Sequence, residues 1–272
     1  MTQRTAAVIG QLARDLVLTV DELPDVGASG AATSRHEQLG GKGANQAVAL
    51  AQLGVRPSLV AVAGDDVIGD VLLDQAKKDG IDVRRVVRRA DTLTGLIVEI
   101  LEPGSKYRYV EHLPLLTEGD VLAARDVIAA ADAVLVQLQQ PFEAALAAAR
   151  IGHEAGKLVV LDGQVTDEAI LPYADVVRAD EKEAEGLDTN GSGLFALAQE
   201  DGNLLIWKDG RVKIPLIGGD PVDTTGGGDS FTAALTAALL TGDSYEEAGR
   251  RATAASGVTV MHVGGRPDLR YV

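Results

Sequence analysis

The chain has 272 residues, of which 46% are hydrophobic and 24% are charged, and this composition is close to the globular average. It excludes a disordered chain, and the length allows one large domain or two small ones with a full core. The formal net charge of −15 argues against a nucleic-acid-binding surface, because a phosphate backbone is held by clustered Lys and Arg.

Cysteine is absent from the sequence, which excludes disulfides and thiolate metal sites and favours the cytoplasm. No apolar run approaches the roughly 18 residues that a membrane helix needs. The four histidines are scattered, and none pairs in the H-E-x-x-H pattern of a zinc site. We therefore expect neither a membrane nor a nucleic acid as a partner.

Short apolar runs alternate with longer Ala-rich segments of helical spacing, which is typical of a mostly parallel sheet. The predicted strands are residues 6–10, 58–63, 133–137, 158–162, 175–178 and 204–207. The predicted helices are residues 44–53, 67–79, 118–131, 141–155, 230–240 and 245–261. The fold class is therefore α/β, with a mostly parallel central sheet flanked by helices.

Two stretches break this rhythm with alternating apolar and polar residues: residues 15–20 with 32–39, and residues 94–101 with 106–110. The second pair indicates a hairpin that turns at Glu102-Pro103-Gly104-Ser105. A small antiparallel sheet would explain both, and such a sheet often covers a site as a lid. We expect one domain over residues 1–272, with lid strands from about 12–39 and 94–112. Apolar edge strands in the lid also favour a homodimer.

Two glycine-rich turns each open a predicted helix, GGKGAN at residues 40–45 and DTTGGGD at residues 223–229. Bare backbone N–H groups converge in such turns, and the helix dipole adds roughly half a positive charge, so both are candidate anion sites. Neither matches a familiar phosphate motif. Lys42 is followed by Gly43 rather than Ser or Thr, which excludes a P-loop, and no G-x-G-x-x-G follows the first strand.

Asp229 follows three glycines and precedes a good helix start. One interpretation is an N-cap, since Asp is a preferred cap. The other is a general base that takes a proton from a hydroxyl while the N–H groups of Gly226, Gly227 and Gly228 stabilise a phosphoryl group that gains charge. The glycines favour the second interpretation, because they allow close approach of the backbone to a substrate and a cap alone does not need them.

The D-T-T-G-G-G-D-S-F run and the upstream G-G-K-G-A-N-Q-A run resemble the two signatures of the ribokinase-like (PfkB) carbohydrate kinases. The resemblance runs from about Ala6 to Pro267 and includes Gly64-Asp65-Asp66 and Thr94-Gly95. It implies a central sheet with a β lid over the sugar. It also implies ATP-dependent transfer of the γ-phosphoryl group to a hydroxyl of a small sugar, such as ribose or a related monosaccharide.

Carried over to this chain, the resemblance also implies roles for individual residues. Asp229 would be the general base, and Gly226, Gly227 and Gly228 would form the anion hole. The residues that would hold sugar hydroxyls are Asp15, Gly41, Lys42, Asn45 and Gln139. Those that would bind the nucleotide are Asp180, Glu183, Thr225 and Gly228, with Glu183 organising hydrated Mg²⁺. A monovalent cation, K⁺, would lie near Asp223, Thr225, Thr259, His262 and Gly264.

Two of these assignments have a purely structural alternative, which is a solvated surface lysine for Lys42 and an ordinary acidic helix start for Asp180 and Glu183. Departures from the family pattern leave the identity of the sugar substrate open. They are Ala13-Arg14-Asp15 for Asn-Ala-Asp, Gln137-Leu138-Gln139 for Gln-Leu-Glu, and residues 112–115 in place of a small turn. A nucleoside kinase is an alternative within the family.

A larger departure lies between residues 186 and 202, where about one helix, one strand and the T-x-G-x-x-G turn of the family are expected to be missing. Either the nucleotide site is remodelled or a segment of the chain is omitted. This shortening favours a third alternative, a non-catalytic member that binds sugar or nucleotide.

Overall fold

The computed structural model describes residues 3–104, 106–188 and 193–270. In these residues the larger sheet has nine strands in the order β13-β12-β11-β10-β9-β8-β1-β4-β5. Its strands are β1 (Thr5–Ile9), β4 (Arg56–Gly64), β5 (Asp82–Arg89), β8 (Ala133–Gln137), β9 (Leu158–Asp162), β10 (Val176–Asp180), β11 (Leu194–Gln199), β12 (Gly202–Trp207) and β13 (Gly210–Pro215). In this order, the strands from β11 through to β5 are parallel to one another. Strand β12 is antiparallel to its two neighbours, β11 and β13.

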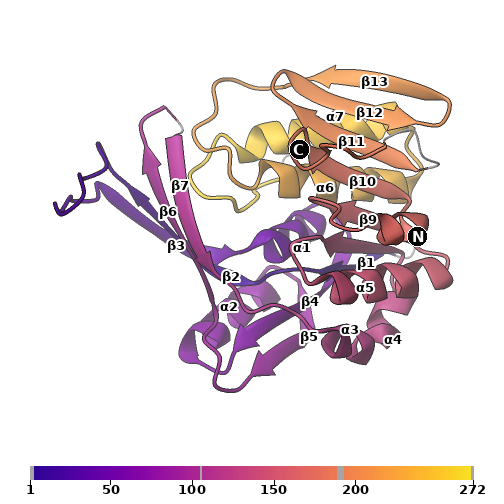
Figure 1. The fold of residues 1–272 in the computed structure, drawn as a ribbon, viewed down its shortest axis with the longest axis horizontal. Coiled ribbons are helices and arrows are strands. Elements are labelled where there is room, and N and C mark those ends of the chain that lie inside the picture. The colour runs from indigo at the N-terminus through magenta and orange to yellow at the C-terminus, as the bar shows by residue number, and fades with distance from the viewer. Residues whose placement is uncertain (1–2, 105, 189–192, 271–272) are drawn as a thin grey trace.

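Helices cover both faces of this sheet (Figure 1). One face carries α1 (Lys42–Gln52), α2 (Val67–Lys78), α6 (Gly227–Thr241) and α7 (Tyr245–Thr259), and the other carries α3 (Glu118–Ala123), α4 (Arg125–Ala130) and α5 (Phe142–Glu154). A short 3₁₀ helix, η1 (Glu168–Tyr173), lies with the second group. Alternate β1 residues enter opposite core layers, Ala6 and Val8 in one and Ala7 and Ile9 in the other, because side chains alternate along a strand.

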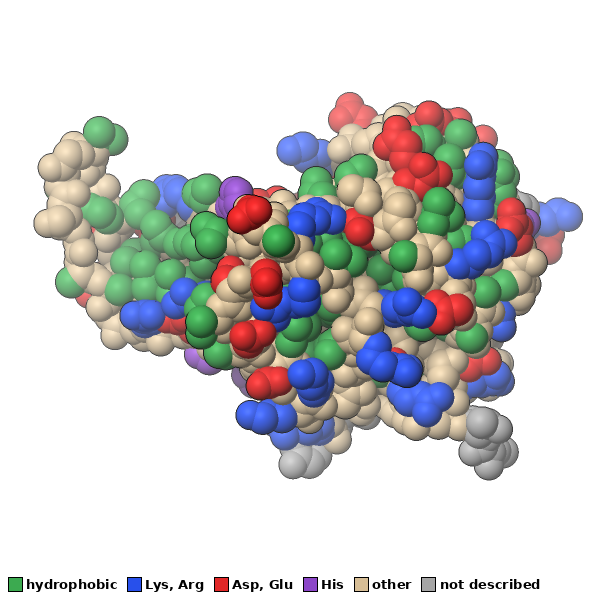
Figure 2. All heavy atoms as spheres, turned by 90° about the horizontal axis from the view of Figure 1, so that it is seen from below, with side chains coloured by type: hydrophobic (Ala, Val, Ile, Leu, Met, Phe, Trp, Pro, Cys, Tyr) green, Lys and Arg blue, Asp and Glu red, His purple; other side chains and the backbone are tan. Residues whose placement is uncertain are grey.

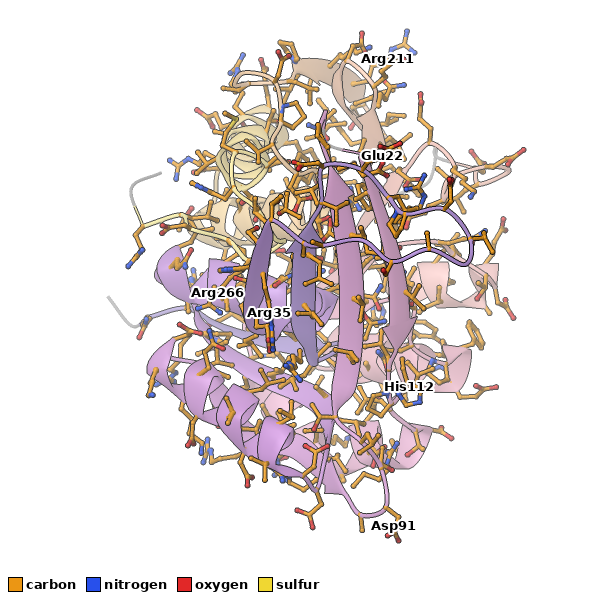
Figure 3. All side chains as sticks on the ribbon, turned by 90° about the vertical axis from the view of Figure 1, so that its left-hand side faces the viewer. Glu22, Arg35, Asp91, His112, Arg211 and Arg266 are labelled. Atoms are coloured by element: carbon orange, nitrogen blue, oxygen red, sulfur yellow. The ribbon has the colours of Figure 1, made fainter. Side chains whose placement is uncertain are left out.

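The smaller sheet contains β2 (Ala13–Thr19), β3 (Ser34–Gly40), β6 (Gly95–Glu102) and β7 (Lys106–His112), in the order β3-β2-β6-β7. The predicted β2–β3 and β6–β7 pairings are confirmed as antiparallel, and a parallel β2–β6 pairing joins them. Figure 3 shows these four strands side by side, with Arg35 on edge strand β3 and His112 at the other edge. We refer to this sheet as the lid. Ser105 of the predicted hairpin turn lies outside the described residues.

The predicted α/β class with a small sheet is confirmed, and three helix predictions need correction. Residues 118–131 form two helices instead of one, since the backbone leaves helical geometry at Ala124 (φ −98°, ψ 8°). Helix α1 begins at Lys42 and α6 at Gly227, both earlier than predicted. Each helix therefore starts inside its glycine-rich turn, which places the turn's N–H groups at the helix N-terminus. No described helix combines the length and the apolarity that crossing a bilayer requires.

The expected loss of a strand between residues 186 and 202 is wrong. Strand β11 occupies that place and pairs with β10 on one side and β12 on the other, so the sheet continues without a gap. Between β10 and β11 the described residues form turns and no helix, and residues 189–192 lie outside the description. The shortening therefore affects the connection between β10 and β11 and not the sheet itself. Loss of an interior strand would leave backbone N–H and C=O groups unpaired.

Candidate active site

A cavity of about 320 Å³ lies between the lid and the carboxyl ends of β1, β8, β9 and β10. This is within the range of small-molecule sites, and the carboxyl ends of parallel strands are where α/β sheets bind ligands. The predicted site residues that line it are Asp15, Gly41, Lys42, Asn45, Gln139, Asp180, Glu183, Thr225, Gly226, Gly228 and Asp229. The fold thus gathers residues that are up to 214 positions apart in the sequence, from Asp15 to Asp229.

Asp229 lies in the first turn of α6 and is not its N-cap. The cap position is held by Gly226, whose φ of 75° is the left-handed region that glycine favours, and no side chain caps this helix. The first backbone N–H groups of a helix have no intrahelical acceptor, and here they belong to Gly227, Gly228 and Asp229. Gly226 and Gly228 line the cavity, whereas Gly227 is buried. The turn can therefore present N–H groups and a carboxylate to one ligand.

The carboxylate of Asp229 is 6% exposed and is held by two amides of α1. Asn45 Nδ2 donates to Oδ2 at 3.2 Å, and Gln46 Nε2 donates to Oδ1 at 3.4 Å. Burial raises the pKa of Asp229 to about 7, repulsion from Asp162 adds to the rise, and Lys42 opposes it. A carboxylate with this pKa suits general base work near neutral pH.

Lys42 is half-buried at the start of α1 and lines the cavity, so the interpretation as a solvated surface lysine does not describe its position. Burial alone would lower its pKa, but the nearby carboxylates of Asp162, Asp229 and Glu183 raise it. The side chain is therefore a cation placed among three carboxylates, next to the proposed anion turn.

Asp162 and Arg178 also line the cavity, and our sequence reasoning missed both. Asp162 is 2% exposed at the end of β9, where it accepts hydrogen bonds from Gln46 Nε2 at 2.9 Å and Thr232 Oγ1 at 3.2 Å. Arg178 Nη1 lies 3.4 Å from Asp162 Oδ1. A Cβ built on Gly228 would meet the Arg178 guanidinium at 2.6 Å, so the cation lies against the glycine turn. The rule that ligands bind at the carboxyl ends of strands could have identified both residues, since each lies within or at the end of a predicted strand.

The predicted sugar contacts lie at the lid side of the cavity. Asp15 on β2 is 6% exposed, and its Oδ1 has no hydrogen-bond partner, nor has Oδ1 of Asn45. Gln139, after β8, accepts a hydrogen bond from Gln11 Nε2 at 3.0 Å. Burial raises the pKa of Asp15 to about 7, with added repulsion from Glu99 and Asp229, while a backbone hydrogen bond from Gly41 opposes the rise. Oδ1 of Asp15 and Oδ1 of Asn45 are thus two buried acceptors that can take hydrogen bonds from a ligand.

Glu99 on lid strand β6 is a further cavity residue that the sequence did not indicate. It is 4% exposed, and its Oε1 accepts a hydrogen bond from Thr225 Oγ1 at 3.2 Å. Burial raises its pKa to about 7, and repulsion from Asp223 contributes. This contact connects the lid to the loop that precedes α6. The sequence offered one indication of Glu99, its charge among the apolar residues of a predicted strand.

Asp180 and Glu183 form a reciprocal turn at the end of β10 rather than a helix start. Glu183 Oε2 accepts from the Asp180 backbone N–H at 2.9 Å, and Asp180 Oδ1 accepts from the Glu183 N–H at 2.7 Å. Both carboxylates face the cavity. Oxygen donors of this kind fit hydrated Mg²⁺, which is commonly bound through one or two carboxylates and substrate phosphates.

The residues proposed for a monovalent cation are only partly brought together. Asp223 accepts hydrogen bonds from the backbone N–H groups of Thr225 at 2.9 Å and Gly264 at 2.7 Å, which ties the two loops together. The hydroxyl of Thr259 instead pairs with Ser230 at 2.7 Å, and the side chain of His262 lines a separate cavity. In the described part of the chain, no group of three or more acidic or imidazole side chains has metal-ligand geometry.

The buried carboxylates predict that the protein is more stable at pH 6 than at pH 8. For Asp15 and Asp229 the folded pKa of about 7 exceeds the ordinary value of 3.8, so the folded state holds protons that the unfolded state has already lost. Stability therefore falls as pH rises through 7, by about 1.4 kcal/mol per independent group between pH 6 and 8. Urea unfolding at the two pH values measures this difference. Equal or greater stability at pH 8 would contradict it, and Asp229→Asn should reduce the difference.

Known proteins resemble this chain in both sequence and fold. The chain matches the family described as "pfkB family carbohydrate kinase" over residues 3–190 and 198–270. It is 30% identical to the ribokinase of Bacillus subtilis over 281 residues, covering 98% of this chain and 96% of the relative. The crystal structure of Thermotoga maritima ribokinase has a TM-score of 0.83 and 27% identity over 97% of this chain and 95% of that one. Arabidopsis thaliana ribokinase, solved with ribose and ATP, has the same fold, with a TM-score of 0.80 and 24% identity over 98% of this chain and 96% of that one.

Proposed function

Because the chain belongs to the pfkB family of carbohydrate kinases and is an ATP-dependent carbohydrate kinase, we propose that it phosphorylates a hydroxyl of a small sugar with Asp229 as general base. The observation that carries the proposal is the position of this buried carboxylate, with a pKa of about 7, beside the N–H groups of the glycine turn. Ribose or a related monosaccharide is the substrate class, by similarity to the ribokinases.

In the proposed reaction, Asp229 accepts the proton of the sugar hydroxyl as the hydroxyl oxygen attacks the γ-phosphorus of ATP. The bond from this phosphorus to the β–γ bridging oxygen breaks, and ADP leaves. N–H groups at Gly226 to Gly228 and the nearby cations of Lys42 and Arg178 offset the charge on the phosphoryl group.

Two residues would hold the metal at the nucleotide end of this site. Asp180 and Glu183 would hold hydrated Mg²⁺, which would supply positive charge to offset that of the nucleotide phosphates. Thr225 is proposed to contact the nucleotide phosphates, and K⁺ is proposed to bind near Asp223 through backbone oxygens. The hydrogen bonds that join Asp223 to Thr225 and Gly264 would couple such an ion to the glycine turn.

A nucleoside kinase is the second candidate, and one specific observation favours it. Tyr107 and Tyr109 of β7 line the cavity and stack on each other, with ring centroids 5.9 Å apart and planes at 17°. Such a pair could form the aromatic wall that a base requires.

We also propose that copies of the chain associate through the outward side of the lid, where Val110 is 76% exposed. Figure 2 shows hydrophobic side chains gathered on the projecting lid.

The function is tested by incubating the purified protein with Mg²⁺-ATP, with and without K⁺, and with ribose, other small sugars and nucleosides. Sugar-dependent ADP release is the expected result. Preferential turnover of nucleosides would replace the sugar kinase by the second candidate. Binding of sugar or ATP with no turnover of any acceptor would instead establish a non-catalytic member of the family.

The pKa of Asp229 predicts the pH dependence of this reaction. The base must be deprotonated, so kcat/KM should be constant above pH 7 and fall about tenfold per pH unit below it. Steady-state rates between pH 5.5 and 8.5 at saturating Mg²⁺-ATP measure the profile. A rate that is flat through pH 6 would exclude a base with this pKa.

A further inference from the structure

The inner face of the lid, which we define by the lid residues that line the cavity, is set by strand register. Its members are Asp15 and Val17 of β2, Ile97 and Glu99 of β6, and Tyr107, Tyr109 and Glu111 of β7. In the sheet, Asp15 lies opposite Ile97, which lies opposite Glu111, and Val17 lies opposite Glu99, which lies opposite Tyr109. Because alternate residues share a face, these side chains form one continuous surface above the sugar position.

This inner face carries three carboxylates, Asp15, Glu99 and Glu111, and no Lys, Arg or His. His36 of β3 lies opposite Val17, but its ring contacts Gln38 and lines a separate cavity. The cations that line the cavity in the described part of the chain, Lys42 and Arg178, lie at the other end among Asp162, Asp229 and Glu183. Both cations of the cavity therefore lie outside the lid, whose inner face carries carboxylates without a cation.

Unpartnered hydrogen-bond acceptors also point to a ligand beside this inner face. Oδ1 of Asp15 is buried without a hydrogen-bond partner, on a residue that is 6% exposed and lines the cavity. Oδ1 of Asn45 is a second unpartnered acceptor on the same cavity. Glu99, 4% exposed, adds a carboxylate that repels Asp15. Buried carboxylates are costly unless a charge of opposite sign pairs with them.

A neutral sugar would donate hydroxyl groups to these acceptors but would leave the carboxylates without a counter-charge. An ammonium group supplies both, since it has three donors and a positive charge. The stacked rings of Tyr107 and Tyr109 are also favourable neighbours for a cation, because the faces of aromatic rings are electronegative.

We propose that the substrate is an amino sugar whose protonated amino group binds between Asp15 and Glu99, on the inner face of the lid. This inference rests on the proposed sugar kinase function and names its substrate class. Glu99 is then a residue that determines specificity. It is positioned by Thr225 and selects the charged substrate over its hydroxyl counterpart.

The test compares matched pairs of pentoses and hexoses, each a parent sugar and its monoamino-deoxy derivative, at pH 7. Calorimetry without ATP measures binding, and steady-state kinetics with Mg²⁺-ATP measures kcat/KM. We expect at least one amino sugar to be preferred over its parent by about tenfold or more in both measurements. Glu99→Gln, which keeps the shape, should reduce that ratio about tenfold, and Asp15→Asn should reduce it further.

Glu37→Gln is the matched control, since Glu37 is exposed on β3 and pairs with Arg14 and Arg35 away from the cavity, so the ratio should not change. A melting curve of each variant reports whether it is folded. Parent sugars that bind and react as well as their amino derivatives would overturn the inference and leave the kinase function intact, as would an unchanged ratio in folded Glu99→Gln. Preferred binding of amino sugars without turnover would support the inference and contradict the kinase function. Binding of neither sugar class would overturn the inference.

Discussion

Replacing Asp229 with Asn is expected to lower kcat by about two to four orders of magnitude, the contribution of a positioned general base. The amide cannot take the proton of the sugar hydroxyl, but it keeps the shape of the carboxylate. Asn45 can adapt to it, because its unpartnered side-chain oxygen can accept from the new amide after rotation, while Gln46 can still donate to the remaining oxygen. The site should therefore stay folded while its chemistry is lost.

The same variant is expected to raise the melting temperature above pH 7, since it removes a buried carboxylate that ionises at a cost. Activity and stability thus change in opposite directions, which general damage to the fold would not produce. Asp220→Asn, at an exposed carboxylate before the glycine turn, is the control and should change neither. An Asp229→Asn enzyme with more than a tenth of the parent kcat would exclude Asp229 as the base.

Replacing Gly226 with Ala is expected to lower both activity and stability. The residue has a φ of 75°, and a Cβ built on it would lie 1.9 Å from the carbonyl oxygen of Gly265. Because the obstacle is backbone, it cannot rotate away, and the start of α6 must shift. Loss of one positioned N–H donor typically costs about 10²- to 10³-fold in kcat, and we expect a decrease in this range.

Gly242→Ala is the matched control for this variant. Gly242 ends the same helix with a φ of 89° and has no atom within 4 Å of its built Cβ, so it carries the backbone strain without the steric conflict. We expect it to cost about 1–2 kcal/mol in the free energy of unfolding with kcat unchanged. Urea unfolding and initial rates measure both variants. A Gly226→Ala enzyme with kcat within threefold of the parent would show that the anion turn does not depend on this geometry.

Sequence patterns predicted secondary structure accurately where a segment's own residues determine it. Strand β8 was predicted with its observed bounds, residues 133–137, because an unbroken apolar run is typical of a strand covered on both faces. The β2–β3 and β6–β7 pairings followed from alternation and turn residues. Helix starts were less accurate, since glycine has poor helix propensity. The first glycine of α6, Gly227, lies against Ser256 of α7 and Val260, neighbours that its own segment does not reveal.

The two glycine turns and Asp229 were identified from the sequence because their chemistry is written in consecutive residues. Glu99, Asp162 and Arg178 were missed because none belongs to a contiguous motif, and each gains meaning only from side chains of other elements that the fold places beside it. The expected missing strand was wrong for a similar reason. The partner of β10 depends on which segment the fold places beside it. That segment is β11, although the described residues between β10 and β11 contain no helix.

The sequence by itself determined the fold class, the family resemblance and the residues proposed for the sugar and phosphate ends of one site, since these depend on periodicity and on short contiguous motifs. The tertiary structure alone decided which charges meet in the cavity. Burial raises the pKa of Asp229 to about 7, and strand register aligns Asp15, Glu99 and Glu111 on the inner face of the lid. Electrostatic energies depend on distance and on exclusion of water, and neither quantity exists until the chain is folded.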